Sequence, residues 1–124
     1  VMSFAMIETK QAVENLDDIM SVPNLTGVYI GPADMSSSYG LPPKFDVRED
    51  PVFSNINLIV KKAKEHGKIA GIHNGTTGYA KEMIRLGYKF VTILSDFRVM
   101  SSHSQEIVNE MKNQSSDKSE SNSY

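Results

Sequence analysis

Two carboxylates, Glu8 and Asp34, stand where two apolar runs of the sequence end. Residues 1–7 are apolar except for one serine, and Glu8 follows them at once. Residues 28–30 are all β-forming, a Gly-Pro pair interrupts them, and Asp34 comes two residues later. Because proline cannot donate a hydrogen bond to a neighbouring strand, we expect the second strand to end at that pair. Both acids are therefore expected just beyond the carboxyl ends of strands.

The carboxyl ends of parallel strands form the edge at which α/β proteins bind ligands. Neighbouring parallel strands lie about 4.8 Å apart, so acids at adjacent strand ends are close enough to share one ion. Hard divalent cations prefer carboxylate oxygens, with water and substrate oxygens completing the shell. An isolated Gly-Pro-Ala-Asp is more simply a turn and a helix cap. However, an acid follows an apolar run twice, as Glu8 and as Asp34, and this recurrence favours a metal site.

Four β-α units are predicted by the alternation of apolar runs with helical spacing. Strands are expected at 1–7, 27–31, 68–73 and 89–94, followed by helices that include 10–21, 51–66, 79–86 and 104–112. Residues 35–49, rich in Ser, Gly and Pro, are expected to form a long loop at the binding edge.

Consecutive β-α units form a parallel sheet with right-handed crossovers. A complete TIM (β/α)8 barrel needs roughly 200 residues or more, so the 124-residue chain is expected to form half of one, over residues 1–112. Residues 113–124 are almost wholly polar and are expected to be a disordered tail. The chain begins with Val and enters an apparent strand almost at once, so we expect a fragment of a longer protein.

The composition excludes several classes of partner. The net charge of −2 provides no electrostatic footprint for nucleic acid, and the absence of cysteine excludes disulfides and thiolate metal sites. Hydrophobic residues make up 40% of the chain, enough for a core, but no segment has transmembrane length and the first residues lack a signal peptide. We expect a cytoplasmic protein with no nucleic-acid partner and no membrane partner.

Short motifs along residues 3–112 carry a family resemblance when they are taken together. They are Met6-Ile-Glu-Thr9, Ala12-Val13-x-Asn15, Asp18-Ile19, Gly27-Val28-x-Ile30-Gly-Pro-Ala-Asp34-x-Ser36, Gly40, Ala70-Gly-Ile-His73, Leu86-Gly87, Phe90-Val-Thr92 and Ser95-Asp96. The chain resembles the class II, metal-dependent pyruvate aldolases of the 4-hydroxy-2-oxoheptanedioate and 2-keto-3-deoxy-sugar-acid aldolase type. That family is grouped with the citrate lyase β-subunit in one superfamily.

The resemblance implies a TIM barrel, of which this chain would supply the C-terminal half, about strands five to eight. It implies that Glu8 and Asp34 bind a divalent metal, Mg²⁺, Mn²⁺ or Co²⁺. It also implies that the backbone of Gly31, Pro32, Ala33 and Asp34 faces the carboxylate of a bound 2-oxo acid. The implied activity is a carbon–carbon lyase that cleaves a 4-hydroxy-2-oxo acid to pyruvate and an aldehyde.

Two further residues are candidates for contact with substrate. His73 is the only histidine expected at the binding edge, where it would touch substrate or a bound water, with a purely structural histidine as the alternative. Ser36 is either an ordinary loop hydroxyl or a donor near the site. The resemblance places the family's catalytic histidine, its aspartate partner and its arginine on the three strands that open the barrel, so no catalytic residue is assigned in this chain.

Two other functions stay open. One is an acyl-CoA lyase of the citrate lyase or malyl-CoA lyase type, although the tetrapeptide from Gly31 to Asp34 favours the free-acid aldolases. The other is a truncated, catalytically silent fragment. A half barrel has open strands at both edges and exposed apolar surface, so we expect it to form a homo-oligomer or to associate with a missing N-terminal half.

Overall fold

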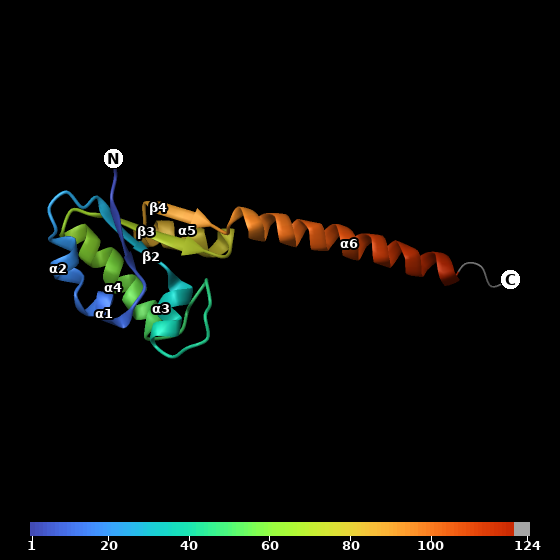
Figure 1. Ribbon diagram of the computed structural model, residues 1–124, viewed down its shortest axis with the longest axis horizontal. Coiled ribbons are helices and arrows are strands. Elements are labelled where there is room, and N and C mark those ends of the chain that lie inside the picture. Colours follow the sequence, from blue (N-terminus) through green and yellow to red (C-terminus); the bar gives the residue numbers. More distant parts are fainter. Residues whose placement is uncertain (121–124) are drawn as a thin grey trace. The chain divides into compact units, whose positions relative to one another are not determined.

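The computed structural model describes residues 1–120, and the side chains of residues 1–113 (Figure 1). It divides into a unit that covers Val1–Ile93 and a second unit that begins at Leu94. The first unit contains a parallel sheet in the order β1-β2-β3-β4, made of β1 (Phe4–Ile7), β2 (Gly27–Ile30), β3 (Ile69–Asn74) and β4 (Phe90–Ile93). The predicted parallel α/β architecture is therefore confirmed.

The helices of this unit connect the strands, but two differ from the prediction. They are α1 (Lys10–Glu14), α2 (Leu16–Met20), α3 (Pro32–Ser38), α4 (Val52–Glu65) and α5 (Thr77–Leu86). The expected helix over 10–21 is divided at Asn15, whose backbone leaves helical geometry and whose side chain donates to the carbonyl of Gln11 at 3.0 Å. The expected loop over 35–49 begins as helix α3, because Pro32 has the backbone angle that the first helical turn needs.

The helices cover one face of the sheet. Side chains alternate between the faces of a strand, and Ile7, Ile30 and Ile72 lie in register with one another, each at 0% exposure. Helices α4 and α5 contact β3 on this side. The core of the unit is completed from the helices by buried side chains that include Leu16, Met20, Val52, Ile56, Ile59, Ala63, Tyr79 and Met83.

The opposite face of the sheet carries aromatic and thioether side chains that are half exposed. Met6 is 50% exposed and Phe90 is 42% exposed. The Phe90 ring lies 5.2 Å from the ring of Phe4 and 5.3 Å from that of Tyr29, between centroids. Gly71 makes room for them, since a Cβ there would lie 2.7 Å from the Tyr29 ring. We refer to this side as the open face, and to the other as the covered face.

The second unit is a single helix, α6 (Asp96–Glu120), where a helix over 104–112 was expected. It begins earlier because Ser95 caps it: the Ser95 carbonyl accepts from the Val99 amide at 3.0 Å, and its hydroxyl from the Arg98 amide at 3.4 Å. Residues 113–120 of the expected disordered tail continue the helix, and 121–124 lie outside the described residues. Within the described part of the chain, no helix is long and apolar enough to cross a membrane.

Candidate active site

The carboxyl ends of the four strands form a polar row on the open face. The row of buried side chains that includes Ile30 and Ile72 belongs to the covered face. Since faces alternate, the next residue along each strand points to the open face. These residues, one strand apart from each other, are Glu8, Gly31, His73 and Thr92. The apolar interior therefore changes to polar side chains at the edge where the sequence predicts a site.

Glu8 and Asp34 converge on Gly31. The position that a Cβ would take on Gly31 lies 3.0 Å from Oε2 of Glu8 and 3.6 Å from Oδ2 of Asp34. Both carboxylate oxygens therefore lie around the same small space, which any side chain on Gly31 would enter. Glu8 follows β1 and is half-buried, whereas Asp34 lies in the first turn of α3 and is exposed.

This pair of acids fits a hard divalent cation. Two carboxylates, one after β1 and one in the first turn of α3, supply oxygen donors only, as Mg²⁺ and Mn²⁺ prefer, and Mg²⁺ commonly keeps several waters beside one or two protein carboxylates. No group of three or more His, Cys, Asp or Glu side chains suited to a metal occurs among the residues that the structure describes. The remaining ligands would therefore come from water, substrate or residues outside this chain.

Helix α3 positions the rest of the predicted substrate-binding segment. Gly31 is its N-cap and Pro32 its first residue, followed by the half-buried Ala33. The hydroxyl of Ser36, which is 2% exposed, donates to the Pro32 carbonyl at 2.8 Å. That donor is already occupied inside the helix, so the structure does not present it to a ligand near Glu8.

His73 lies in the polar row, and its ring is held from two sides. Its Nδ1 lies 2.9 Å from Oγ1 of Thr92, the residue paired with it on β4. The Phe45 ring packs edge-on against the imidazole, with centroids 5.2 Å apart. Tyr29 lies one residue row below and reaches Oγ1 of Thr92 with its hydroxyl at 2.5 Å. The sequence did not assign Phe45, Thr92 or Tyr29 to the site, although Thr92 is part of a family motif, because strand register and the anchored loop bring them to His73.

The loop over 39–51 is anchored rather than free, and this determines where Phe45 lies. The two carboxylate oxygens of Asp46 accept from the Gly75 amide at 2.7 Å and from the Thr76 hydroxyl at 2.6 Å. The buried Tyr79 hydroxyl donates to the Val47 carbonyl at 2.6 Å. Burial first, and then the nearby Asp46 carboxylate, raise the pKa of Tyr79 to about 12. Hydrogen bonds from the turn after β3 and from α5 therefore hold this loop next to His73.

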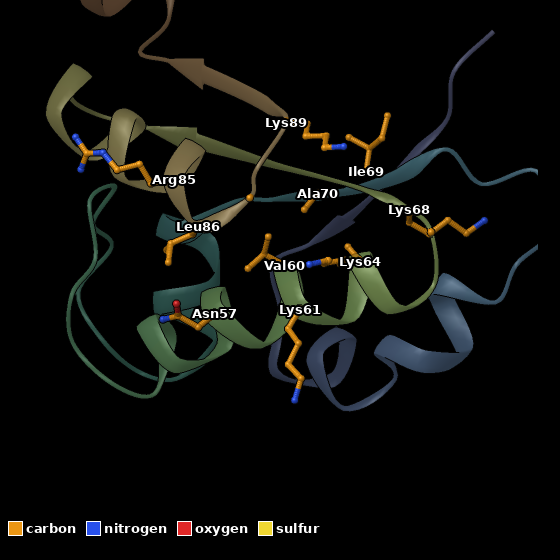
Figure 2. A pocket seen from close by; sticks show the side chains of 13 residues that line it. Asn57, Val60, Lys61, Lys64, Lys68, Ile69, Ala70, Arg85, Leu86 and Lys89 are labelled. Atoms are coloured by element: carbon orange, nitrogen blue, oxygen red, sulfur yellow. The ribbon is translucent and has the colours of Figure 1, made fainter.

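A large cavity lies elsewhere and does not coincide with these acids. It has a volume of about 810 Å³ and lies where α4 and α5 end and β3 and β4 begin (Figure 2). Val60, Ala70 and Leu86 line it between the sheet and the helices, whereas Lys61 and Arg85, which also belong to its lining, extend away from them in Figure 2. No carboxylate lines it. This amino-end cavity therefore has no carboxylate to bind a divalent cation, and we assign the metal site to the carboxyl edge.

A parallel sheet of β-α units with acids at its carboxyl edge defines a protein of the α/β-barrel class, of which four strands are about half. The chain belongs to the HpcH/HpaI aldolase/citrate lyase family, whose model matches residues 1–102. This membership confirms the family resemblance found in the sequence.

Proteins with similar sequences are named as aldolases. The chain is 36% identical over 108 residues to a hydroxypyruvate/pyruvate aldolase of Rhizorhabdus wittichii, covering 87% of this chain and 43% of that protein. It is 34% identical over 87 residues to a 2-keto-3-deoxy-L-rhamnonate aldolase of Escherichia coli, covering 70% of this chain and 32% of that protein. The chain therefore spans less than half the length of these relatives.

A solved structure agrees on the fold. The HpcH/HpaI aldolase of Desulfitobacterium hafniense superposes with a TM-score of 0.83 at 20% identity, over 90% of this chain and 43% of that one. The sheet and its helices therefore correspond to about half of an aldolase barrel.

Proposed function

We propose that this chain supplies the metal-binding half of a class II aldolase that cleaves a 4-hydroxy-2-oxo acid to pyruvate and an aldehyde. The observation that carries the proposal is the convergence of Glu8 and Asp34 on Gly31, within a family of aldolases. The named relatives include a hydroxypyruvate/pyruvate aldolase, which supports pyruvate as one product.

Glu8 and Asp34 would hold Mg²⁺, Mn²⁺ or Co²⁺ through their carboxylate oxygens. When bound there, such a cation would supply Lewis-acid stabilisation of the negative charge that develops during carbon–carbon cleavage. The absence of a side chain on Gly31 keeps the space at the two acids open.

The backbone from Gly31 to Asp34 would orient the substrate carboxylate. The Asp34 amide is in the first turn of α3, where N–H groups have no partner within the helix. Amides that are fixed before the reaction stabilise negative charge without reorganising. His73, two strands from Glu8 in the same row, would contact substrate.

Metal binding by the chain itself is the direct test. Calorimetric titration of Mn²⁺ into the wild-type chain should show one site, and Glu8→Gln or Asp34→Asn should each weaken binding by about tenfold or more, because half of the protein ligands is lost. Glu14→Gln and Asp18→Asn are the matched controls, since both acids are exposed on the short helices before β2. Equal affinity in all five proteins would refute the metal site.

Activity would be tested by combining the chain with the remainder of its barrel and measuring pyruvate release with and without EDTA. We expect release that EDTA abolishes and that added Mn²⁺ or Mg²⁺ restores. Release that continues at the same rate in EDTA would overturn the metal-dependent assignment.

We also propose that the chain works in an assembly, as a homo-oligomer or with a missing N-terminal half. Strands β1 and β4 are the edges of the sheet, and Met6 and Phe90 are half exposed on the open face. Unpaired strand edges and exposed apolar surface favour association. Sedimentation velocity should show complexes larger than the 13.8 kDa chain. A cooperatively folding monomer would argue against this assembly.

A cytoplasmic location remains a prediction.

A further inference from the structure

Three polar side chains from three adjacent strands form one hydrogen-bonded cluster on the open face. The hydroxyl of Tyr29 on β2 lies 2.5 Å from Oγ1 of Thr92 on β4. That same oxygen lies 2.9 Å from Nδ1 of His73 on β3. All three side chains are half-buried. The Tyr29 hydroxyl is 3.5 Å from His73 Nδ1, so its shorter contact is with Thr92.

The protons in this cluster have one arrangement that gives every donor an acceptor. Tyr29 and Thr92 each carry a single hydroxyl hydrogen. If Tyr29 donates to Thr92, then Thr92 donates to Nδ1 of His73, and both hydrogens are used. If Nδ1 of His73 instead carried a hydrogen and donated to Thr92, the cluster would hold three hydrogens. Either Thr92 or Tyr29 would then donate in the contact between them, and the hydroxyl hydrogen of the other would have no acceptor within the cluster.

The backbone around His73 keeps the cluster in place. Asn74, which is 0% exposed, donates through Nδ2 to the carbonyl of Thr92 at 2.9 Å and to that of Ile72 at 3.1 Å. The Asn74 side chain therefore links the carboxyl end of β3 to that of β4, beside Thr92. Phe45 packs edge-on against the imidazole at 5.2 Å. Rotation of the His73 ring would have to break the bond to Thr92 and displace Phe45.

We propose that Thr92 and Tyr29 hold His73 as the neutral tautomer whose proton is on Nε2, so that His73 donates a hydrogen bond to a substrate oxygen and is not a general base. In this tautomer Nδ1 accepts from Thr92 and Nε2 carries a hydrogen, which leaves no free lone pair on the ring to remove a proton from substrate. Thr92 and Tyr29 are then positioning residues.

The role of the donor rests on the proposed function, because it assumes that substrate binds at Glu8 and Asp34. Gly31, on which those acids converge, lies one strand from His73 in the polar row. One strand spacing is about 4.8 Å. A ligand bound at the two acids therefore has a hydrogen-bond donor at its side, and the substrate class this fits is an acid with a carbonyl, hydroxyl or carboxylate oxygen directed toward β3.

The tautomer can be tested without activity, by ¹⁵N NMR of the histidine-labelled chain at about pH 8.5, above the ordinary pKa of histidine of about 6.5. The His73 signals are assigned by their loss in His73→Gln. We expect hydrogen on Nε2 in the wild type and a mixture of tautomers in Thr92→Val and in Tyr29→Phe. Thr92→Ser keeps the hydroxyl and should restore the wild-type spectrum. Thr77→Val, a matched change at an exposed threonine of α5, should leave it unchanged.

Hydrogen on Nδ1 of wild-type His73 would overturn the proposal, as would a Thr92→Val spectrum equal to the wild type. If Thr92→Val does not fold, the comparison of wild type with Tyr29→Phe and Thr92→Ser decides in the same way.

The donor role is tested in the pyruvate-release assay. His73→Gln carries an amide N–H and should keep most of kcat/KM, whereas His73→Leu, which has no donor, should lose at least about tenfold. Equal loss in both variants, or none in either, would refute the donor role. If pyruvate release fails altogether, the proposed function fails, while the tautomer result remains decided by NMR.

Discussion

The covered and open faces of one sheet are built from the same four strands but differ in what they do. On the covered face, Ile7, Ile30 and Ile72 are fully buried beneath helices. On the open face, Met6 and Phe90 are half exposed, and the row beyond them is polar. Packing against helices stabilises the first face, and the second carries the groups that can do chemistry. Stability and function are therefore separated by the alternation of single residues along each strand.

The two ends of the strands show a second aspect of this difference. A cavity of about 810 Å³ is at the amino ends and has no carboxylate in its lining. At the carboxyl ends, the carboxylates of Glu8 and Asp34 meet at Gly31. In a barrel, residues at the carboxyl edge are free for catalysis because the strands and helices below already supply the stability.

The largest effect is expected from a truncation on the covered face. Ile30→Ala removes a fully buried side chain and should lower the free energy of unfolding by about 2–5 kcal/mol, through lost burial and the cavity that remains. Met6→Ala, on the neighbouring strand of the open face, should cost less than about 1 kcal/mol, since Met6 is 50% exposed. Urea unfolding followed by circular dichroism measures both. Equal losses would mean that the open face is covered in solution.

A methyl group added to the open face tests how tightly its aromatic layer is packed. Gly71→Ala places a Cβ 2.7 Å from the Tyr29 ring and 3.0 Å from the Phe90 carbonyl, so we expect a loss of about 1–3 kcal/mol by overpacking. Gly78→Ala in α5 is the control, because nothing lies within 4 Å of its Cβ position. That change should be neutral or slightly stabilising, since alanine favours helix. Thermal unfolding compares the two, and similar melting temperatures would contradict the tight layer.

Removing one hydroxyl beneath the loop over 39–51 should have a smaller effect. Tyr79→Phe loses the buried hydrogen bond to the Val47 carbonyl, and we expect a loss of about 1 kcal/mol. The pKa of Tyr79 is raised to about 12 in the folded chain. The stabilisation by its hydroxyl is therefore complete below pH 10, the ordinary pKa of tyrosine, and is lost as pH rises through about 12. The difference in free energy of unfolding between wild type and Tyr79→Phe, measured in urea, should narrow over that interval. A gap independent of pH would contradict the raised pKa.

The smallest effect is expected on the outer surface of the helical layer. The Asp17 carboxylate accepts from Nε2 of His66 and from Nζ of Lys62, each at 2.9 Å, and these bonds hold its pKa below 3.8. Because this pKa is lowered, the ionised Asp17 stabilises the folded chain above pH 3.8, and that stabilisation is lost as pH falls through the lowered pKa. Asp17→Asn should therefore lower the melting temperature slightly at neutral pH and not at about pH 2. Since Asp17 is exposed, a large effect at neutral pH would be unexpected.

Much of the fold was predictable because it depends on local patterns. All four strands were expected within a few residues of their observed bounds, and Glu8 and Asp34 were placed at strand ends from the apolar runs alone. The break at Asn15 was missed because it depends on one backbone conformation within an otherwise helical pattern. The length of α6 was missed because a polar composition is compatible with both an exposed helix and disorder.

The candidate site was predictable in part. The positions of the acids and His73 at the strand ends followed from the sequence, whereas their roles in binding stay predictions. Thr92, Tyr29 and Phe45 were not assigned to the site: Thr92 appeared only within a family motif, and a tyrosine in an apolar run and a phenylalanine in a loop give no local signal. Ser36 was expected to be either a loop hydroxyl or a donor near the site, and contact with substrate stays a prediction; the bond of its hydroxyl to Pro32 could not be foreseen, because the sequence did not predict α3 as a helix.

The sequence by itself determined the order of elements, the family and the pair of acids at the carboxyl edge, because apolar periodicity and short motifs are properties of neighbouring residues. Only the tertiary structure decided which residues meet across strands: the two carboxylates over Gly31, and Tyr29 with Thr92 and His73. Strand register sets those contacts, and a shift of one residue would turn each side chain to the other face.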